Sequence, residues 1–221
     1  METADQVQAM IFREVSSDDV EVHGEYLKHF EVVAKAFAES MAKAFLKWRD
    51  FDSELKGDAR RAHVSALVYV AITLHVSSMK DFLAGQPVAA GNLSRQVLEC
   101  IALAFLCSGK DSDVLKRFME DKYSSNKAIN EVLKHCKKLS LKGDALKVLK
   151  KSQDFYHKYS HVTKMTLAAA TSFFQKGELY LGASFDDGKL EVYKKEINLR
   201  VSLADAFPNF VDGVSANVAK W

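Results

Sequence analysis

The sequence is poor in the residues that make turns and crosslinks. Its 221 residues include two prolines, ten glycines and three cysteines. A large antiparallel β architecture needs many turns, which Gly and Pro mostly supply, so this architecture is excluded. An odd number of cysteines with no Cys-x-x-Cys spacing argues against a disulfide framework and against a zinc site. We therefore expect a reducing, cytoplasmic compartment, with Cys100 and Cys107 as small core residues rather than reactive thiols.

Targeting signals and long apolar runs are also missing. The first ten residues lack the basic start and the apolar stretch of a signal peptide. The most apolar segment, residues 62–76, contains Ser65, Thr73 and His75 and is too short and too polar to span a bilayer. We interpret it as a buried helix and expect no membrane partner. The content of 48% apolar and 27% charged residues is that of a soluble globular protein.

Apolar residues occur at helical spacing along nearly the whole chain. Between Tyr26 and Trp48 they recur at steps of three and four, while lysines occupy the opposite face. Glycines separate this segment from further segments of the same kind. Pro208 should kink or end the last long helix, with a short helix after it. The expected long helices cover about residues 20–56, 59–83, 87–106, 112–138, 143–174 and 190–207.

These helices predict a single all-α domain over residues 1–221. We expect an up-and-down bundle of five to six helices, because short breaks place consecutive helices side by side. Residues 178–188 contain alternating residues and the pair Asp187 and Gly188, so a short extended segment or hairpin is expected there. No linker, internal repeat or low-complexity segment divides the chain.

Two charged residues lie in a helix that should be largely buried. Arg95 and Glu99 are four residues apart, which places both on one face of the helix over residues 87–106. A buried charge requires a partner, and these two side chains can neutralise each other. They form either a structural ion pair or a site in which Arg95 binds an anion and Glu99 orients it.

A second polar group is the sequence Tyr-His-Lys-Tyr-Ser-His at residues 156–161. His157 and His161 are four residues apart and Asp154 precedes His157 by three, so all three should share a helix face. This spacing makes the two histidines weak candidates for metal ligands, although a di-iron bundle needs two Glu-x-x-His pairs and this chain has one Asp-x-x-His and no second copy. The favoured interpretation is an interior network or the floor of a cleft. The candidate ligand-binding residues are Arg95, Glu99, Tyr156, His157, Ser160 and His161.

Charge is distributed unevenly, although the net charge is only +2. Residues 115–164 contain 13 Lys or Arg and five Asp or Glu, a net charge of +8, whereas residues 1–57 carry −5. Such a run is usually a solvated face, and it is also what a nucleotide, RNA or an acidic partner requires. The run lacks interleaved aromatic residues for base stacking. The basic patch comprises Lys134, Lys137, Lys138, Lys142, Lys147, Lys150 and Lys151.

Two of these segments resemble a known group of proteins. Leu-Ser-Arg-x-x-x-Glu at residues 93–99 and Tyr-x-x-Tyr-Ser-His at residues 156–161 resemble a family of uncharacterised bacterial helical proteins. That family is distantly similar to the HEPN (higher eukaryote and prokaryote nucleotide-binding) superfamily. The resemblance covers roughly residues 60–205 and implies the site residues Arg95, Glu99, Ser160 and His161.

This chain differs from HEPN ribonucleases in one feature. Those enzymes carry an Arg and a His separated by four to six residues on one helix, and this sequence has no such pair. We therefore expect a non-enzymatic helical module, most simply a homodimer without a cofactor. It would bind a nucleotide, a nucleic acid or a protein partner through an Arg95/Glu99/His161 cleft and the basic patch.

Two alternatives remain open from the sequence. One is a nuclease-like enzyme in which His161 is the general acid or base and Arg95 stabilises a phosphate transition state. The other is a metal-binding bundle that uses His157 and His161.

Overall fold

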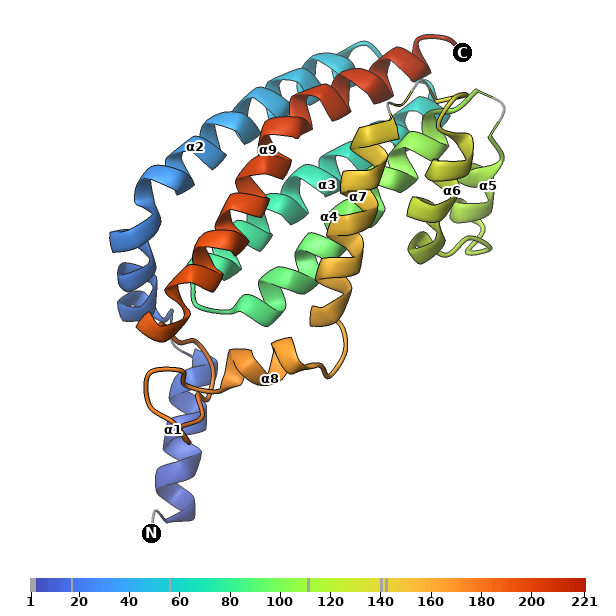
Figure 1. The fold of residues 1–221 in the computed structure, drawn as a ribbon. Coiled ribbons are helices and arrows are strands. Elements are labelled where there is room, and N and C mark those ends of the chain that lie inside the picture. Colours follow the sequence, from blue (N-terminus) through green and yellow to red (C-terminus); the bar gives the residue numbers. More distant parts are fainter. Residues whose placement is uncertain (1–2, 17, 56, 111, 140, 142) are drawn as a thin grey trace.

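The computed structural model describes residues 3–16, 18–55, 57–110, 112–139, 141 and 143–221, except for the side chains of residues 143–147. Within these residues the chain is all-α, as predicted, and is divided into nine α-helices (Figure 1). The helices are α1 (Ala4–Ser16), α2 (Val20–Ser53), α3 (Ala59–Leu83), α4 (Pro87–Ser108), α5 (Val114–Met119), α6 (Ala128–His135), α7 (Gly143–Tyr156), α8 (Lys164–Ala170) and α9 (Leu190–Val218).

Four long helices, α2, α3, α4 and α9, form the body of the protein. Consecutive helices α2, α3 and α4 run up and down, and α9 lies beside α2 (Figure 1). Two contacts with the same sequence offset show that α2 and α9 are parallel: Ser40 Oγ donates to Asp205 at 2.5 Å, and Lys47 pairs with Asp212. Of the apolar stripe predicted for the first long helix, Tyr26, Phe30, Phe37 and Met41 are buried in this core, and Val33 and Trp48 are partly buried against it. Phe45, predicted on the same stripe, is 40% exposed, while Ala44 and Phe51 are buried as well.

The central helix α3 begins and ends where the sequence predicts. The Asp58 carboxylate caps it by accepting a hydrogen bond from the Arg61 backbone N–H at 3.1 Å. By length and composition α3 could cross a membrane, with a mean hydropathy of 1.4 and 44% of that window buried. It packs against α2, α4 and α9 and buries polar residues such as His75 and Ser78, as the core helix of a soluble protein does. The structure is therefore compatible with a soluble protein.

Two of the predicted helices are broken. The helix expected over residues 112–138 is divided into α5, the 3-10 turn η1 (Ser125–Lys127) and α6. Asp121 follows α5 with φ of 55°, a left-handed conformation that cannot continue a helix. Tyr123 then donates to Glu131 at 3.0 Å, which fastens the turn to α6. This break positions the side chains of α5 and η1 beside α4, where they line the site described below.

The helix expected over residues 143–174 is broken as well. It ends at Tyr156, continues as the 3-10 turn η2 (His157–Tyr159), and resumes only as α8. Thr163 starts α8 with a reciprocal capping box, accepting from the Thr166 N–H and donating its own N–H to Thr166 Oγ1. His161 therefore lies between helices and not on a helix face.

The break predicted at Pro208 is not observed, because α9 runs unbroken through this residue. Proline removes one backbone hydrogen bond, but the buried rings of Phe207 and Phe210 hold the helix against the core on both sides. Residues 178–188 form no strand in the described structure. Their region contains one isolated antiparallel bridge between Thr171 and Leu179, followed by the 3-10 turn η3 (Asp187–Lys189).

Candidate functional site

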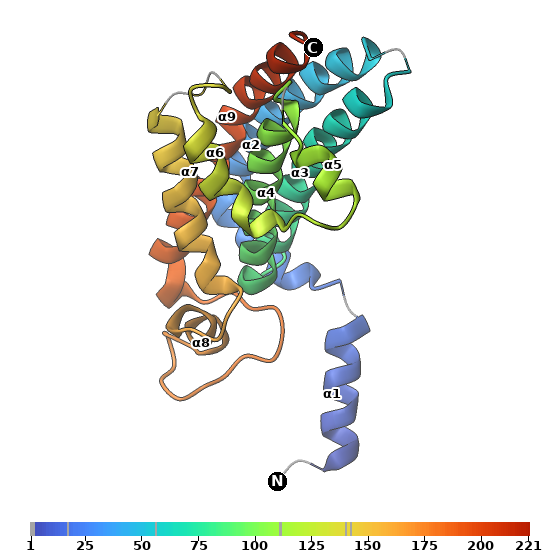
Figure 2. The same cartoon turned by 90° about the vertical axis from the view of Figure 1, so that its right-hand side faces the viewer.

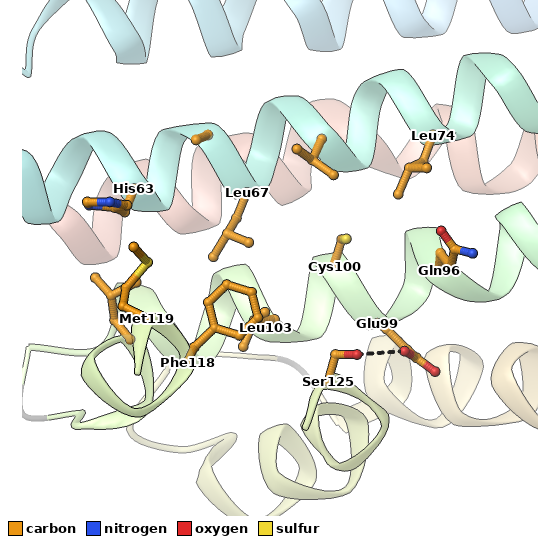
Figure 3. Close-up of a pocket in the computed structure, with 13 residues that line it drawn as sticks. His63, Leu67, Leu74, Gln96, Glu99, Cys100, Leu103, Phe118, Met119 and Ser125 are labelled. Atoms are coloured by element: carbon orange, nitrogen blue, oxygen red, sulfur yellow. Dashed lines mark hydrogen bonds between the residues drawn. The ribbon is translucent and has the colours of Figure 1, made fainter. Parts of the chain in front are cut away.

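A hollow of about 560 Å³ lies between α3, α4, α5 and η1 (Figure 3). Its walls are mostly apolar, and its few polar side chains lie at the ends. Glu99 and Ser125 face each other at one end, and His63 lies near Met119 at the other (Figure 3). The lining residues are His63, Ala66, Leu67, Val70, Leu74, Gln96, Glu99, Cys100, Leu103, Leu115, Phe118, Met119 and Ser125.

Glu99 is the charged residue of this hollow. Only 8% of Glu99 is exposed, and each carboxylate oxygen accepts one hydrogen bond. Arg95 Nε donates to Oε1 at 2.9 Å, and Ser125 Oγ donates to Oε2 at 2.9 Å. An ionised carboxylate has about four acceptor positions, and the described residues occupy two of them. The pair suggested by the four-residue spacing therefore forms, and a third residue joins it from η1.

Arg95, which bonds to Glu99, is partly exposed to solvent. Its side chain is 22% exposed, and that of Glu99 is 11% exposed. Among the described residues, Arg95 makes its one hydrogen bond through Nε. The Nη groups of the guanidinium can therefore receive an anion from solvent.

Cys100 contributes a thiol to the same wall, and its pKa argues against a reactive role. Burial, with a smaller effect from the charge of Glu99, raises the pKa of Cys100 to about 11. Burial raises the pKa of Cys107 to about 12. Both thiols are protonated near neutral pH, and the thiolate is the nucleophile, so the two side chains act as small apolar groups.

The two candidate histidines lie on the surface. His157 and His161 are both exposed, and their ring centroids are 4.5 Å apart. Asp154, the third member of the predicted face, pairs with Lys150 at 3.0 Å. The described part of the chain contains no group of three His, Cys, Asp or Glu side chains placed to hold a metal ion. No hydrogen bond or ion pair between described residues joins His161 to Arg95.

The other two predicted site residues lie elsewhere in this segment. Ser160 is half-buried and donates its backbone N–H to the carbonyl of His157 at 3.1 Å. Tyr156 is buried, and the guanidinium of Arg200 lies 5.7 Å from the centre of its ring. The structure thus separates the candidate set into the Arg95–Glu99 pair, the exposed histidine pair and an interior group that includes Tyr156.

That interior group is a sealed polar network that no sequence pattern drew attention to. Arg200 is 1% exposed and donates to Glu196 Oε2 at 2.7 Å, and its Nε donates to Ser78 Oγ at 3.1 Å. Tyr159 donates to the other Glu196 oxygen, Oε1, at 2.5 Å. Burial and the adjacent charge of Glu196 raise the pKa of Tyr159, so its hydroxyl stays protonated and donates. The sequence feature that could have indicated this network is the pair Glu196 and Arg200, four residues apart within the apolar stripe of α9.

The sealed network is closely packed where α4 meets η2. A Cβ atom added at Gly91 of α4 would overlap the ring of Tyr159, so this glycine is needed for close approach. His75 lies beside the network, with Nε2 at 3.0 Å from the carbonyl of Arg200. Burial lowers the pKa of His75 to about 3, which keeps the imidazole neutral. The network joins α3, α9 and η2 as an internal brace.

The basic patch is exposed where the structure describes it. Lys134, Lys137, Lys138 and Lys151 are exposed, and Lys150 is partly buried by its ion pair with Asp154. Lys142 and the side chain of Lys147 lie outside the described residues. The patch follows α6 and α7, which lie side by side (Figure 2).

No protein-family model matches the chain, and neither a curated protein nor a solved structure matches it. The resemblance to HEPN proteins therefore stays a prediction.

Proposed function

We propose that the protein is a non-enzymatic helical module that binds a nucleotide in the hollow beside Glu99. One observation carries the proposal: a nearly buried carboxylate, held by Arg95 and Ser125, lies at the edge of an apolar hollow of about 560 Å³. Small-molecule sites are typically concave and mostly apolar, with a few polar groups that fix the orientation of the ligand.

The chemistry of the hollow suits a nucleobase. A base has two apolar faces and a polar edge. The side chains of Leu67, Cys100 and Leu103 offer apolar contact to the faces. The Glu99 carboxylate accepts hydrogen bonds from the edge, which favours a base with adjacent N–H donors, such as guanine. The amide of Gln96 adds one donor and one acceptor at the same end of the hollow (Figure 3).

The phosphate group requires a cation at the mouth of the hollow. Arg95 fits this role, since its guanidinium is partly exposed and a guanidinium binds phosphate oxygens in a fork. The basic patch extends the positive charge along α6 and α7 and suits the backbone of an RNA strand. A mononucleotide tests the hollow alone, and a short RNA tests the hollow together with the patch.

The placement of His161 supports the non-enzymatic part of the proposal. A general base is usually held by a third group that orients its ring. His161 is exposed, and within the described residues its ring contacts only that of His157. RNA cleavage by purified protein that is lost in His161→Ala would favour the nuclease-like alternative. Metal retained by purified protein and lost in that variant would favour the metal-binding alternative.

The direct experiment is calorimetric titration of the full chain with GMP and with AMP. We expect GMP to bind more tightly. Glu99→Gln removes the charge and one acceptor while keeping the shape, so it should weaken GMP binding by about tenfold or more, as expected for a charge-assisted hydrogen bond worth about 1.5–3 kcal/mol. Arg95→Lys should weaken GMP more than guanosine, because it removes the phosphate fork as well as one of the two hydrogen bonds that hold Glu99.

The matched control is Glu39→Gln. Glu39 forms an ion pair of the same spacing with Lys43 at 2.7 Å on the exposed face of α2. This variant should bind GMP like the parent chain. The proposal is wrong if no nucleotide binds at about 1 mM, the weak end of specific affinity, or if Glu99→Gln and Glu39→Gln behave alike.

A further inference from the structure

The N-terminal helix α1 is not packed into the body of the protein. None of its 13 residues is buried, and it projects away from the long helices (Figures 1 and 2). Glu14 fastens it at one point, accepting a hydrogen bond from the Ala183 N–H at 3.0 Å. Four large apolar residues of α1 are exposed: Met10 at 45%, Ile11 at 47%, Phe12 at 70% and Val15 at 80%. The last three share one side of the helix. They lie within an arc of about 100°, the width of an apolar helix stripe.

A second apolar groove lies in the body. It has a volume of about 750 Å³ and runs between α4, α7 and α9. Its floor includes Leu98, Ile101 and Phe105 of α4 and Leu203 of α9. Two of its apolar side chains reach solvent, Val148 at 65% and Leu199 at 40% exposed. An amphipathic helix that lays its apolar face into such a groove is a recurrent form of recognition.

The dimensions of helix and groove agree. A 13-residue helix is about 20 Å long, and the groove follows α9 from Leu199 to Gly213, a rise of about 21 Å. Ser202, Ala206 and Gly213 line it on the α9 side, and small residues let a second helix approach closely.

The charges of helix and groove wall are opposite in sign. Helix α1 holds Asp5 and Glu14 against Arg13, a net charge of −1, and α7 holds three lysines against Asp144 and Asp154, a net charge of +1. Lys150 and Lys151 follow the groove residues Val148 and Leu149 on α7.

We infer that α1 of a second copy of this chain fills the groove. In its own chain α1 leads into α2 and points away from the body (Figure 1). The face of α9 that packs on α2, marked by Asp205 and Asp212, also differs from the face that lines the groove. When two chains exchange α1 reciprocally, each groove is filled and the assembly closes as a two-fold dimer. This inference does not depend on the nucleotide proposal.

The test measures self-association of the full chain by sedimentation velocity across a concentration series. The parent chain should be a dimer. Val15→Asp and Phe12→Asp should each weaken dimerisation by about tenfold or more, because a charge enters an apolar groove. Neither variant threatens the fold, since no α1 residue is buried. The matched control is Val32→Asp on α2, because Val32 is also 80% exposed.

A complementation experiment tests reciprocity. Ala206→Trp blocks the groove and leaves α1 intact, so this variant alone should be monomeric. Mixed with Val15→Asp, it should form a heterodimer, because one intact α1 and one intact groove remain. The inference is overturned if the parent chain is monomeric at all concentrations, as docking of α1 in its own groove would give. It is equally overturned if Val15→Asp and Val32→Asp dimerise alike, or if the mixed variants do not associate.

Discussion

Two Arg–Glu pairs with the same four-residue spacing occur in this protein, and their surroundings differ. Arg95 and Glu99 on α4 have side chains that are 22% and 11% exposed, and Glu99 lines an apolar hollow. Arg200 and Glu196 on α9 have side chains that are 1% and 3% exposed and border other side chains on every side. The spacing is thus sufficient to form an ion pair, while tertiary packing decides whether that pair can meet a ligand.

The hydrogen-bond partners of the two pairs show the same contrast. Glu99 is held by Arg95 on the same helix and by the hydroxyl of Ser125 on a 3-10 turn. Glu196 is held by Arg200 and by the buried hydroxyl of Tyr159. The buried pair Arg200–Glu196 fixes how the helices of the core are oriented. The partly exposed pair Arg95–Glu99 can exchange a contact within the protein for a contact with a ligand. We therefore expect opposite consequences when each pair is broken.

The largest effect is expected for the sealed pair. Glu196→Gln leaves the Arg200 guanidinium buried without a counter-charge, so it should lower the free energy of unfolding by about 3–5 kcal/mol. The double variant Glu196→Leu/Arg200→Met removes both charges and should recover much of that loss. Urea unfolding followed by circular dichroism measures both. A single variant as stable as the parent chain would show that the network is not a brace.

Sequence patterns predicted the first pair and the long helices for a simple reason. Helical spacing of apolar residues is a local property, and α3 and α4 begin where it places them. The breaks after Met119 and after Tyr156 depend on contacts between distant residues, such as those that Tyr159 makes with Gly91 and Glu196. Such contacts leave no periodic trace in the sequence.

The site itself was predictable only in part. Arg95 and Glu99 stand out as charges within an apolar helix. Ser125 and Phe118 could not be connected to them, because both reach the hollow only after the chain breaks between α5 and α6. His161 was grouped with Arg95 on the assumption of a continuous helix over residues 143–174, and that helix ends at Tyr156.

A second prediction concerns how the stability of the protein depends on pH through the buried imidazole of His75. Burial lowers the pKa of His75 to about 3, against about 6.5 in an unfolded chain. The unfolded state therefore binds a proton below pH 6.5 that the folded state refuses until about pH 3. Stability contributed by His75 is complete above pH 6.5 and falls as the pH drops, by up to about 1.4 kcal/mol per pH unit.

The variant His75→Gln isolates this contribution. It keeps a donor for the carbonyl of Arg200 but does not titrate. Between pH 6.5 and pH 5 the parent chain should lose stability more steeply than the variant in urea unfolding. Parallel pH profiles for the two chains would mean that the pKa of His75 is not lowered in the folded state.

The open pair should tolerate change better than the sealed pair. Glu99→Gln keeps the contact with Ser125 and loses a partly solvated ion pair, so it should cost about 1 kcal/mol of folding free energy. The same variant should abolish most GMP binding, which makes function more sensitive than stability at this site. A loss as large as that of Glu196→Gln would place Glu99 among the structural groups and contradict the comparison.

The smallest expected effect concerns the alkylation rates of the cysteine thiols and does not involve the stability of the fold. Cys100 lines the open hollow with a pKa of about 11, and Cys107 is fully buried with a pKa of about 12. Alkylation requires the thiolate, so the rate at Cys100 should rise about tenfold per pH unit between pH 7 and pH 10, while Cys107 reacts only on unfolding. Mass spectrometry of iodoacetamide-treated protein reports each site separately.

If GMP occupies the hollow, saturating GMP should slow the labelling of Cys100 and leave that of Cys136, which lies outside the hollow, unchanged. Equal protection of both cysteines would point to a general tightening of the fold and would place the nucleotide elsewhere.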